Sequence, residues 1–591
     1  LYESTPHTGP KTIIKVIQSK QKSVYWEPYN REHDDRYNVT RNLYKNLLGN
    51  VLCFEEINHD LQIAFRYSWQ FSSEFGISRQ CKLENLSEQT CSLEIIDGLQ
   101  NILPAGTPLF TQSQSSNLVD AYKWTEVDRE TGLALYTLYS AITDRAEPVE
   151  ALRANTVFRL GLPGSTVHLT SSSLDMFKAG KVLESSDYSR GVRSCYLVHS
   201  HVTLAAHGEQ KWSINVDVEK DQTDVVALKQ ALLNESAVAE EMRQSFLTGS
   251  DKLARIMASS DGFQVTGEED VSLHHYANTL FNVLRGGIFA NQYQVSRADL
   301  LKTLQHFNHD IYERQKIALS NLPENVSLDE LMLSVEELQD AQLSRLIYEY
   351  LPITFGRRHG DPSRPWNQFA IELKDDRGQP LLSYQGNWRD IFQNWEALTL
   401  SYPSFIESVI AKFVNASTLD GYNPYRITKQ GIDWEVEEPD DPWSYIGYWG
   451  DHQIIYLLKL LESSNNFHPG KLASLLEQSV YSYANVPYRI KPLHNIIDSP
   501  KDTVLFDNEM AENIERNIER LGSDGKLVLD AQGQVYQVSL VEKIFIPLLS
   551  KLSNLVIDGG IWLNTQRPEW NDANNALVGQ GLSMVTLCYL N

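Results

Sequence analysis

The chain has 591 residues, of which 42% are hydrophobic and 22% charged, a composition typical of globular proteins and not of disordered ones. Its length predicts two or more domains, or one very large domain. Acidic residues outnumber basic ones by 76 to 52, and the net charge of −24 disfavours nucleic acid and anionic membranes as partners, because both bind basic surfaces. A neutral ligand such as a sugar is compatible with this charge, and the 12 Trp, 28 Tyr and 20 Phe residues could line a sugar groove as well as fill the core.

The five cysteines are odd in number and scattered, and no CxxC pair occurs. This pattern predicts neither a disulfide framework nor a zinc site and favours a reducing compartment, so we expect a cytoplasmic protein. No signal peptide is visible and no apolar run is long enough to span a bilayer. The first residue is not Met and the last residues resemble the start of a helix, so we expect a fragment of a longer protein.

Residues 1–222 are predicted to form an antiparallel β-sandwich. Hydrophobic residues alternate with mainly polar ones over residues 61–71, the period of a half-buried strand. Similar alternation or enrichment in β-branched and aromatic residues recurs at residues 91–96, 133–138, 166–170 and 194–205, with Gly, Pro and Asn between the runs.

One of these predicted strands contains His199 and His201, which are two residues apart and so share a face, and His207 follows them. A metal site could be built in this way, but no clear carboxylate or cysteine ligand accompanies them in the sequence. We therefore interpret the histidines as a solvated strand face and predict no metal site.

From about residue 224 onward the hydrophobic pattern has the helical period. Ser296 with Asp299, and Ser404 with Glu407, precede apolar helical stretches in the manner of capping boxes. Apart from one candidate pair of short strands near residues 526–538, no strand-rich interval is expected between these helices.

The predicted domain order is a β-sandwich at residues 1–222, a helical linker at 223–270 and a helical catalytic domain at 271–591. Successive helices joined by long polar loops favour an α/α-toroid of the six-hairpin type, and no fixed repeat period supports an α-solenoid. The helical stretch is too short for six helix pairs with long loops, so the toroid is expected to be truncated at its C-terminus.

The first loop suited to sugar chemistry, residues 355–367, contains Arg357, Arg358 and His359 among Gly and Pro residues that disfavour regular structure. These side chains could bind phosphate or sugar hydroxyl groups, and they could equally form a structural hub of salt bridges.

A second loop, residues 385–390, ends in Trp388, Arg389 and Asp390 at the start of a predicted helix. The simplest interpretation is that Asp390 favours the helix N-terminus and pairs with Arg389.

A third loop, residues 440–452, carries four aromatic residues in seven positions, including Trp449, and then Asp451 at a helix start. It could stack on a sugar, or its rings could form a hydrophobic plug while Asp451 caps the helix.

The fourth loop, residues 567–579, places Glu569, Trp570, Asp572 and three asparagines between a Pro and a Gly. So many polar groups would need buried partners in a core element, so the segment is predicted to be a loop that presents a carboxyl group beside an indole ring. Such a pairing suits carbohydrate chemistry, although an exposed turn with an anchoring Trp is the alternative.

The segment Trp570-Asn571-Asp572, followed by Val578-Gly579, resembles the Asp-Trp-Asn-Asp-Gly motif of the cellobiose and chitobiose phosphorylase family. The resemblance implies that Asp572 is the general acid. Glu569 replaces the first Asp of the motif and keeps its charge, whereas Ala573 replaces its Gly and disfavours a positive φ.

The same resemblance covers other parts of the chain. That family has a β-sandwich before its catalytic domain, and residues 97–106 resemble a segment of it. It also has an aromatic-Arg-Asp sequence ahead of a helix, which implies that Arg389 and Asp390 contact the sugar at the cleaved end. An acidic residue and a His open a barrel helix near its active-site end, as Asp451 and His452 do here. The substrate-binding residues expected on these grounds are Arg389, Asp390, Trp570, Glu569, Trp388, Trp449 and Asp451.

The function predicted from the sequence is cleavage of a β-glucosidic linkage with inversion, by phosphorolysis of a gluco-oligosaccharide to a sugar 1-phosphate. The alternatives are an inverting glycoside hydrolase of the same fold and a non-catalytic glucan-binding module. No cofactor is expected, since inorganic phosphate would be the co-substrate, with Arg357, Arg358 and His359 as candidate phosphate ligands. The expected partner is an oligosaccharide, and the resemblance implies a homodimer.

Overall fold

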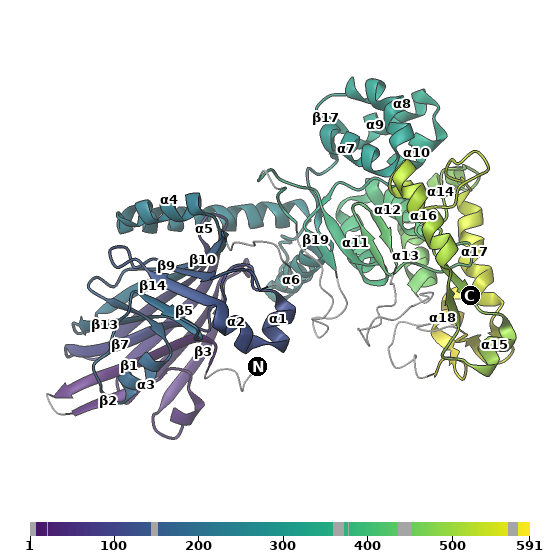
Figure 1. Cartoon of the computed structure of the whole chain (residues 1–591). Coiled ribbons are helices and arrows are strands. Elements are labelled where there is room, and N and C mark those ends of the chain that lie inside the picture. Colours follow the sequence, from purple (N-terminus) through teal and green to yellow (C-terminus); the bar gives the residue numbers. More distant parts are fainter. Residues whose placement is uncertain are drawn as a thin grey trace. The chain divides into compact units, whose positions relative to one another are not determined.

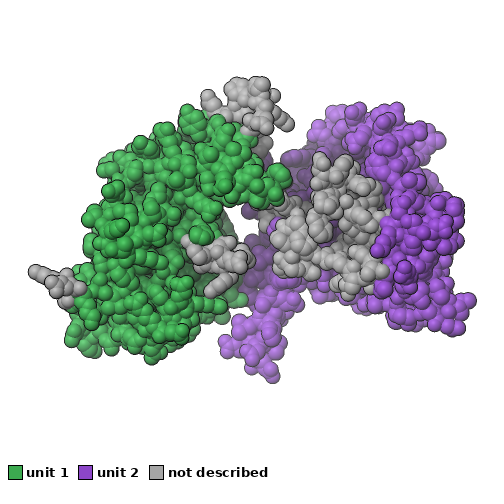
Figure 2. Space-filling view, turned by 60° about the horizontal axis from the view of Figure 1, so that its bottom comes forward, with its two compact units in different colours: residues 1–255 green, residues 256–591 purple. Residues whose placement is uncertain are grey.

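The computed structural model describes residues 7–19, 22–142, 152–358, 372–375, 378–434, 452–564 and 577–591. The chain divides into two compact units, Leu1–Arg255 and Ile256–Asn591, which are coloured separately in Figure 2. The division falls inside helix α5 (Glu235–Ser259), within the stretch predicted as a helical linker. None of the described helices is both long and apolar enough to cross a membrane.

The first unit contains two antiparallel sheets (Figure 1), and the predicted antiparallel β-sandwich is confirmed. The strands of the five-stranded sheet are, in spatial order, β11 (Thr166–Thr170), β13 (Ser194–Leu204), β7 (Cys91–Gln100), β1 (Gly9–Ser19) and β2 (Lys22–Trp26). Those of the nine-stranded sheet are β12 (Tyr188–Arg190), β8 (Lys123–Val127), β9 (Ala134–Leu138), β10 (Ala154–Leu160), β14 (Glu209–Lys220), β6 (Gly76–Asn85), β5 (Ile63–Ser72), β4 (Leu52–Asn58) and β3 (Val39–Lys45).

The two sheets share one apolar core, to which Ile14 and Ile95 contribute from the five-stranded sheet and Phe65 and Leu83 from the nine-stranded sheet. Each of these side chains is at most 1% exposed, and their burial on alternate positions is what the period-two pattern predicts. Short helices accompany the sheets: η2 (Arg31–His33), α1 (Leu109–Gln114), α2 (Ser116–Tyr122), α3 (Ser172–Lys178) and α4 (Gln222–Leu232). The predicted helical linker at residues 223–270 begins with most of α4 and with α5, which are separate helices because the Asn234 side chain accepts a hydrogen bond from the Ala237 amide and starts the second one.

The second unit is mainly helical and is built around a large apolar core. Its helices are α6 (Glu269–Gly286), α7 (Arg297–Phe307), α8 (His309–Ser320), α9 (Leu328–Leu338), α10 (Ala341–Tyr348), α11 (Trp388–Ser401), η3 (Pro403–Phe405), α12 (Ile406–Asn415), α13 (His452–Phe467), α14 (Lys471–Leu475), α15 (Leu493–Asp498), α16 (Asn508–Leu521), η4 (Ser523–Lys526), α17 (Leu540–Leu552) and α18 (Met584–Leu590). The α/α-toroid and its truncation stay predictions.

Four helices of this unit, α7 to α10, form a subdomain with its own apolar core (Figure 1). A two-stranded pair, β16 (Gln294–Ser296) with β17 (Asn325–Ser327), ties the two halves of the subdomain together. The chain enters it at β15 (Ile288–Phe289) and leaves it at β18 (Ile353–Thr354), and these two strands pair with each other. We call residues 288–354 the four-helix subdomain.

The expectation that no strand-rich interval separates the helices is wrong for residues 356–433. A four-stranded sheet has the order β19 (Gly356–Arg358), β20 (Tyr384–Asn387), β21 (Arg426–Thr428) and β22 (Gly431–Asp433). Its strands are three or four residues long, too short to display a period of two. Three smaller pairings involve β23 (Tyr488–Ile490), β24 (Val504–Phe506), β25 (Leu555–Val556), β26 (Gly560–Trp562) and β27 (Leu582–Ser583).

One of the two predicted capping pairs is present. Ser296 accepts a hydrogen bond from the Asp299 amide at the start of α7, as predicted. The second pair is wrong, because Ser404 lies inside the 3-10 turn η3 and the Glu407 carboxylate is buried. Glu407 instead accepts hydrogen bonds from the Ser464 hydroxyl of α13 at 2.6 Å and from Nδ1 of His468, the residue after α13, at 2.9 Å. Glu407 therefore joins α12 to the C-terminal end of α13.

Helix α17 buries charged residues in its inward stripe. Lys543 is only 1% exposed, its ammonium lies 3.7 Å from the centre of the Tyr483 ring, and it donates to the Ser417 carbonyl at 3.3 Å. Burial holds the pKa of the Lys543 amine well below its usual value, although the neighbouring Glu542 opposes the shift. Since the unfolded amine titrates near pH ~10.4, its protonation at neutral pH opposes folding, and this cost fades as the pH rises toward that value.

Replacing Lys543 with Met is therefore expected to raise the free energy of unfolding at pH 7 by about 1 kcal/mol or more, the gain found when buried charged groups are replaced by apolar side chains of similar size. The gain should shrink between pH 7 and pH ~10, because the wild-type cost disappears there. Urea denaturation at both pH values measures the two differences. Lys471→Met, at an exposed helix position, is the matched control and should change neither. If Lys543→Met stabilised the protein equally at both pH values, protonation of the buried amine would not be the cause of the stabilisation.

Candidate functional site

The four-stranded sheet of the second unit brings together segments that the sequence singled out separately. Strand β19 runs parallel to β20, whereas β21 is antiparallel to both of its neighbours, β20 and β22. The register pairs Arg358 with Gly386, Asn387 with Arg426, and Arg426 with Asp433. These residues therefore lie in two adjacent rows at one end of the sheet, which we call the Arg426 end.

Three of the predicted sugar loops are connected along the chain to the strands of the Arg426 end. The loop that contains His359 continues from Arg358, the segment Trp388–Asp390 follows Asn387 directly, and the 440–452 loop follows β22 along the chain. Parallel strands end at the same edge of a sheet, so the Arg357–Arg358 pair and the start of α11 are neighbours. The structure thus places a candidate phosphate-binding segment beside a candidate sugar-binding segment.

Asp390 lies in the first turn of α11, where the helix dipole favours a carboxylate. Its Oδ2 accepts a hydrogen bond from Asn387 Nδ2 at 3.2 Å, so the residue before the helix helps to orient it. The start of the helix is also fixed by the Trp388 amide, which donates to the Tyr425 carbonyl at 2.9 Å. Arg389 occupies the position between these residues, but its side chain is outside the described part of the structure. Asp390 is thus held at the Arg426 end as a contact with a sugar hydroxyl would require.

Trp388 has a different role from the one predicted. Its side chain is fully buried, and its ring centre lies 4.5 Å from that of Phe413 and 5.5 Å from that of Phe392. A ring without exposed surface gives no face on which a sugar could stack, so we interpret Trp388 as an anchor that holds the first turn of α11 in the core.

A charged cluster at the Arg426 end was not identified from the sequence. Arg426 donates to Asp433 Oδ2 from Nη2 at 2.6 Å and from Nε at 3.1 Å, and Lys526 donates to Asp433 Oδ1 at 2.7 Å. Burial acts to raise the pKa of the Asp433 carboxyl, but Lys526 and Arg426 together hold it below its usual value. The cluster ties the β21–β22 hairpin to η4 and fixes the strand from which the 440–452 loop departs.

Asp433→Asn is expected to destabilise the protein by about 1–2 kcal/mol at pH 7, the lower part of the range for hydrogen bonds to charged groups, because the side chain is 32% exposed. A native pKa below the unfolded value of about 3.9 stabilises the fold above that pH, and the contribution is lost as the pH falls through the native pKa. The difference in the free energy of unfolding between Asp433→Asn and the wild type, measured by urea denaturation, should therefore become smaller below pH ~4. An unchanged difference at pH 3 would contradict the ionic role of Asp433.

The remaining predicted site residues lie outside the described residues: His359, Trp449, Asp451, Glu569, Trp570 and Asp572. The side chain of Arg358 is not described either, and Arg357 is partly exposed on β19. The role of Asp572 as the general acid stays a prediction.

The second unit also contains a groove of about 490 Å³. It is lined by Tyr422, Arg489, Asn554 and Asn564, and Asn564 is the last described residue that precedes the predicted 567–579 loop in the sequence. Its size falls within the range of small-molecule sites, about 300–1,000 Å³. Tyr422 is three residues before Tyr425, whose carbonyl fixes the start of α11, so the chain links this groove to the Arg426 end.

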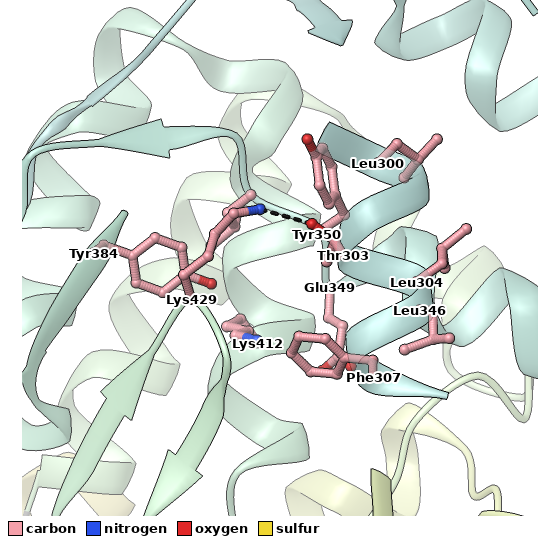
Figure 3. A pocket seen from close by; sticks show the side chains of 11 residues that line it. Leu300, Thr303, Leu304, Phe307, Leu346, Glu349, Tyr350, Tyr384, Lys412 and Lys429 are labelled. Carbon is pink, nitrogen blue, oxygen red and sulfur yellow. Dashed lines mark hydrogen bonds between the residues drawn. The ribbon is translucent and has the colours of Figure 1, made fainter. Parts of the chain in front are cut away.

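A cavity at the opposite end of the small sheet is too small for a sugar. It has a volume of about 20 Å³, room for about one water molecule, and lies where the four-helix subdomain meets the rest of the unit (Figure 3). Lys429 crosses this seam and donates to Asp299 Oδ2 and to the Thr303 hydroxyl, both at 2.9 Å. Tyr384, the first residue of β20, and Lys412 of α12 line the cavity from the other side. The seam therefore anchors the subdomain and is a separate feature from the candidate site.

The prediction that no carboxylate accompanies His199 and His201 is wrong. Glu94 lies on the neighbouring strand β7, and its Oε1 is 2.9 Å from His199 Nε2. The two residues are 105 positions apart in the sequence, so no local pattern could reveal the pairing.

Comparison with known proteins identifies one part of the chain. Residues 289–352 match the family model of glycoside hydrolase family 149 insertion domain 1, and the match covers nearly all of the four-helix subdomain. No curated protein sequence matches the chain.

Similarity to solved structures is low. A bacterial glucoamylase complexed with acarbose shares 11% identity at a TM-score of 0.33, over 81% of this chain and 63% of the glucoamylase. A candidate kojibiose phosphorylase from the human microbiome shares 11% identity at a TM-score of 0.28, over 77% of this chain and 55% of the phosphorylase. A galactose mutarotase-like protein from Clostridium acetobutylicum shares 9% identity at a TM-score of 0.18, over 37% of this chain and 81% of that protein. The chain thus spans less than two thirds of the glucoamylase and of the phosphorylase, and at such TM-scores no argument rests on the likeness. The insertion-domain match alone places a domain of a glycoside hydrolase family in the chain, in agreement with the predicted class of enzyme, a glycoside hydrolase or phosphorylase.

Proposed function

We propose that the chain belongs to an inverting carbohydrate-active enzyme that cleaves a β-glucosidic linkage, with phosphorolysis of a gluco-oligosaccharide to a sugar 1-phosphate as its reaction. The observation that carries the proposal is the glycoside hydrolase family domain at residues 289–352. The loop sequence Trp570-Asn571-Asp572 and the neighbouring positions of Arg357–Arg358 and Asp390 support it independently.

In this proposal Asp572 donates a proton to the oxygen of the leaving sugar. The carboxyl group must be protonated at the working pH, which partial burial or a nearby carboxylate such as Glu569 would favour by raising its pKa. Asp390 and Arg389 hold the hydroxyl groups of the sugar ring whose bond is cleaved, and Trp570 packs against a sugar face. These contacts hold the sugar ring on two sides while it passes through the oxocarbenium-ion-like transition state.

The nucleophile decides between the two candidate reactions. Phosphate attacks the anomeric carbon from the face opposite the leaving group, so a phosphorylase needs cationic or hydrogen-bonding ligands but no protein base. Arg357, Arg358 and His359 are the proposed ligands, since β19 brings this segment to the start of α11. A hydrolase would instead need a second carboxylate to activate water, about 6.5–9.5 Å from the acid. Asp390, Glu396, Asp451 and Glu569 are the residues that could take this role.

Product analysis tests the proposal. The full-length protein is incubated with β-linked gluco-oligosaccharides, with and without inorganic phosphate, and the products are separated by anion-exchange chromatography. Phosphate-dependent formation of a sugar 1-phosphate supports phosphorolysis. Cleavage that needs no phosphate would replace phosphorolysis by hydrolysis, and binding without cleavage in either condition would overturn the enzymatic proposal in favour of a glucan-binding module.

A matched variant sharpens the choice of nucleophile. Arg357→Met should raise the KM for phosphate while the KM for the oligosaccharide changes little. The reason is that, of the two substrates, the side chain is proposed to contact the phosphate and not the oligosaccharide. Arg129→Met is the control, since Arg129 is an exposed arginine of the first unit that pairs with Asp187. An equal change in both KM values would show that Arg357 supports the fold of the loop and does not bind phosphate.

A further inference from the structure

The outer face of the five-stranded sheet carries a compact group of metal-ligating side chains. His201 of β13 and Glu94 of β7 are directly opposite each other in the register, and His199 lies two residues from His201 on the same face. Among the described residues, Glu94, His199 and His201 each offer one ligand atom, and these atoms lie within 4.8 Å of one another. We propose that Glu94, His199 and His201 form a binding site for Zn²⁺ or a similar divalent transition-metal ion, which pins β7 to β13.

The donor set selects the class of ion. Two imidazoles and one carboxylate suit Zn²⁺, Cu²⁺ or Ni²⁺, whereas Mg²⁺ and Ca²⁺ prefer oxygen ligands. Three protein ligands leave a fourth tetrahedral position, and the exposure of His201 keeps that side open to a water molecule. Metal–ligand bonds of about 2.0–2.2 Å place neighbouring ligand atoms roughly 3.3–3.5 Å apart, so closing the site requires rotation of side chains and no movement of the strands.

The surroundings hold two of the ligands in place. The Lys15 ammonium on β1 is 2.8 Å from Glu94 Oε2, which leaves Oε1, the oxygen beside His199, for the ion. The His199 ring packs in edge contact with Phe177 of α3 at 5.8 Å and with His201 at 5.3 Å between ring centres. Glu94 and His199 are each 17% exposed, so the surrounding side chains restrict their rotation, and the rotation that closes the site falls mainly to the exposed His201. In known metal sites, a ligand carboxylate is oriented in the same way, by a hydrogen bond from a residue that does not itself bind the metal.

Nearby groups explain which residues are not ligands and why the affinity should be modest. The ring centre of His168 lies 6.1 Å from that of His199. However, both of its ring nitrogens are already hydrogen-bonded, Nδ1 with the Glu184 carbonyl and Nε2 with the Thr166 hydroxyl. The Lys15 charge repels a cation, so we expect affinity in the micromolar range. Binding replaces the His199–Glu94 hydrogen bond. The proton that Nε2 donates to Glu94 is released to solvent, the neutral ring carries its one proton on Nδ1, and the lone pair of Nε2 binds the ion.

Titration of the metal-free protein with Zn²⁺ by calorimetry, and with Co²⁺ by visible absorption, tests the proposal. We expect one ion per chain and Co²⁺ bands of a tetrahedral nitrogen–oxygen site. His201→Ala, at an exposed position that should not disturb folding, and Glu94→Gln should each weaken binding at least about tenfold. His207→Ala is the matched control, since this exposed histidine pairs only with Glu88 and should leave the affinity unchanged.

Three results would overturn the assignment. They are the absence of stoichiometric Zn²⁺ binding by the wild type, equal affinity in His201→Ala and the wild type, and a sulfur-to-cobalt charge-transfer band, which would identify a cysteine site instead. Circular dichroism of each variant shows that the fold is retained. None of these measurements depends on catalysis, so their outcome is independent of the proposed function.

Discussion

Replacing Asp572 with Asn is expected to lower the rate of β-glucoside cleavage by the full-length enzyme by about 10²–10⁴-fold, the usual contribution of a general acid. Asn has nearly the same shape as Asp but cannot donate a carboxylic proton, so binding and folding should change little. The effect should therefore fall on kcat and on kcat/KM together, because protonation of the leaving group occurs only in the transition state. Steady-state kinetics with a β-linked gluco-oligosaccharide measure both parameters.

The leaving group provides a second test of the same role. A dinitrophenyl β-glucoside leaves as a stable anion and needs little protonation, so the Asp572→Asn variant should lose much less activity on it than on an oligosaccharide. Asp558→Asn is the matched control: this exposed aspartate has a φ of 60°, which Asn also tolerates, and full activity is expected. An equal loss on both substrates would assign Asp572 to structure or binding, and full activity on the oligosaccharide would remove it from the mechanism.

The β-sandwich was predictable because its strands are long and half-buried. A ten-residue strand such as β5 repeats its alternation often enough to exceed chance. The four-stranded sheet of the second unit escaped prediction for the opposite reason: its three- and four-residue strands are specified by contacts with α6 and α11 and have no period of their own. The close approach of Gly287 to β18 and β19 illustrates this, since a Cβ there would lie 2.4 Å from the Thr354 carbonyl oxygen.

The candidate site was predictable only in part, and the limits follow from the range of the interactions. Composition identified the loop segments that are connected along the chain to the strands of the Arg426 end, because Arg, Asp and aromatic residues between Gly and Pro are unusual in core elements. The ion pair of Asp433 with Lys526 could not be predicted, since the two residues are 93 positions apart and no local pattern links them. Glu94 and His199 present the same difficulty. Burial of Trp388 could not be read from a motif that suits a helix start and a sugar site equally well.

Replacing Arg345 with Met is expected to be the most destabilising of these changes, at about 3–5 kcal/mol at pH 7. Arg345 of α10 is fully buried and donates to Asp524 Oδ2 of η4 at 2.5 Å and to Glu349 Oε1 at 3.1 Å. It therefore anchors the four-helix subdomain to the rest of the second unit. Its removal leaves the Asp524 carboxylate, itself 0% exposed, without its cationic partner in a site that excludes water.

The pH dependence of this loss distinguishes an unpaired charge from a cavity. Burial raises the pKa of the Asp524 carboxyl, and Arg345 opposes that rise, so in Arg345→Met the pKa should rise further. A native pKa above the unfolded value of about 3.9 means that ionisation opposes folding, and the cost disappears as the pH falls toward that value. Urea denaturation should therefore show a smaller loss at pH ~5 than at pH 7. Arg314→Met, which removes a half-exposed arginine paired with Asp340 in the same subdomain, should cost no more than about 1 kcal/mol at either pH. A loss in Arg345→Met that is equal at both pH values would indicate lost packing, and a loss no larger than that of Arg314→Met would show that the buried cluster does not anchor the subdomain.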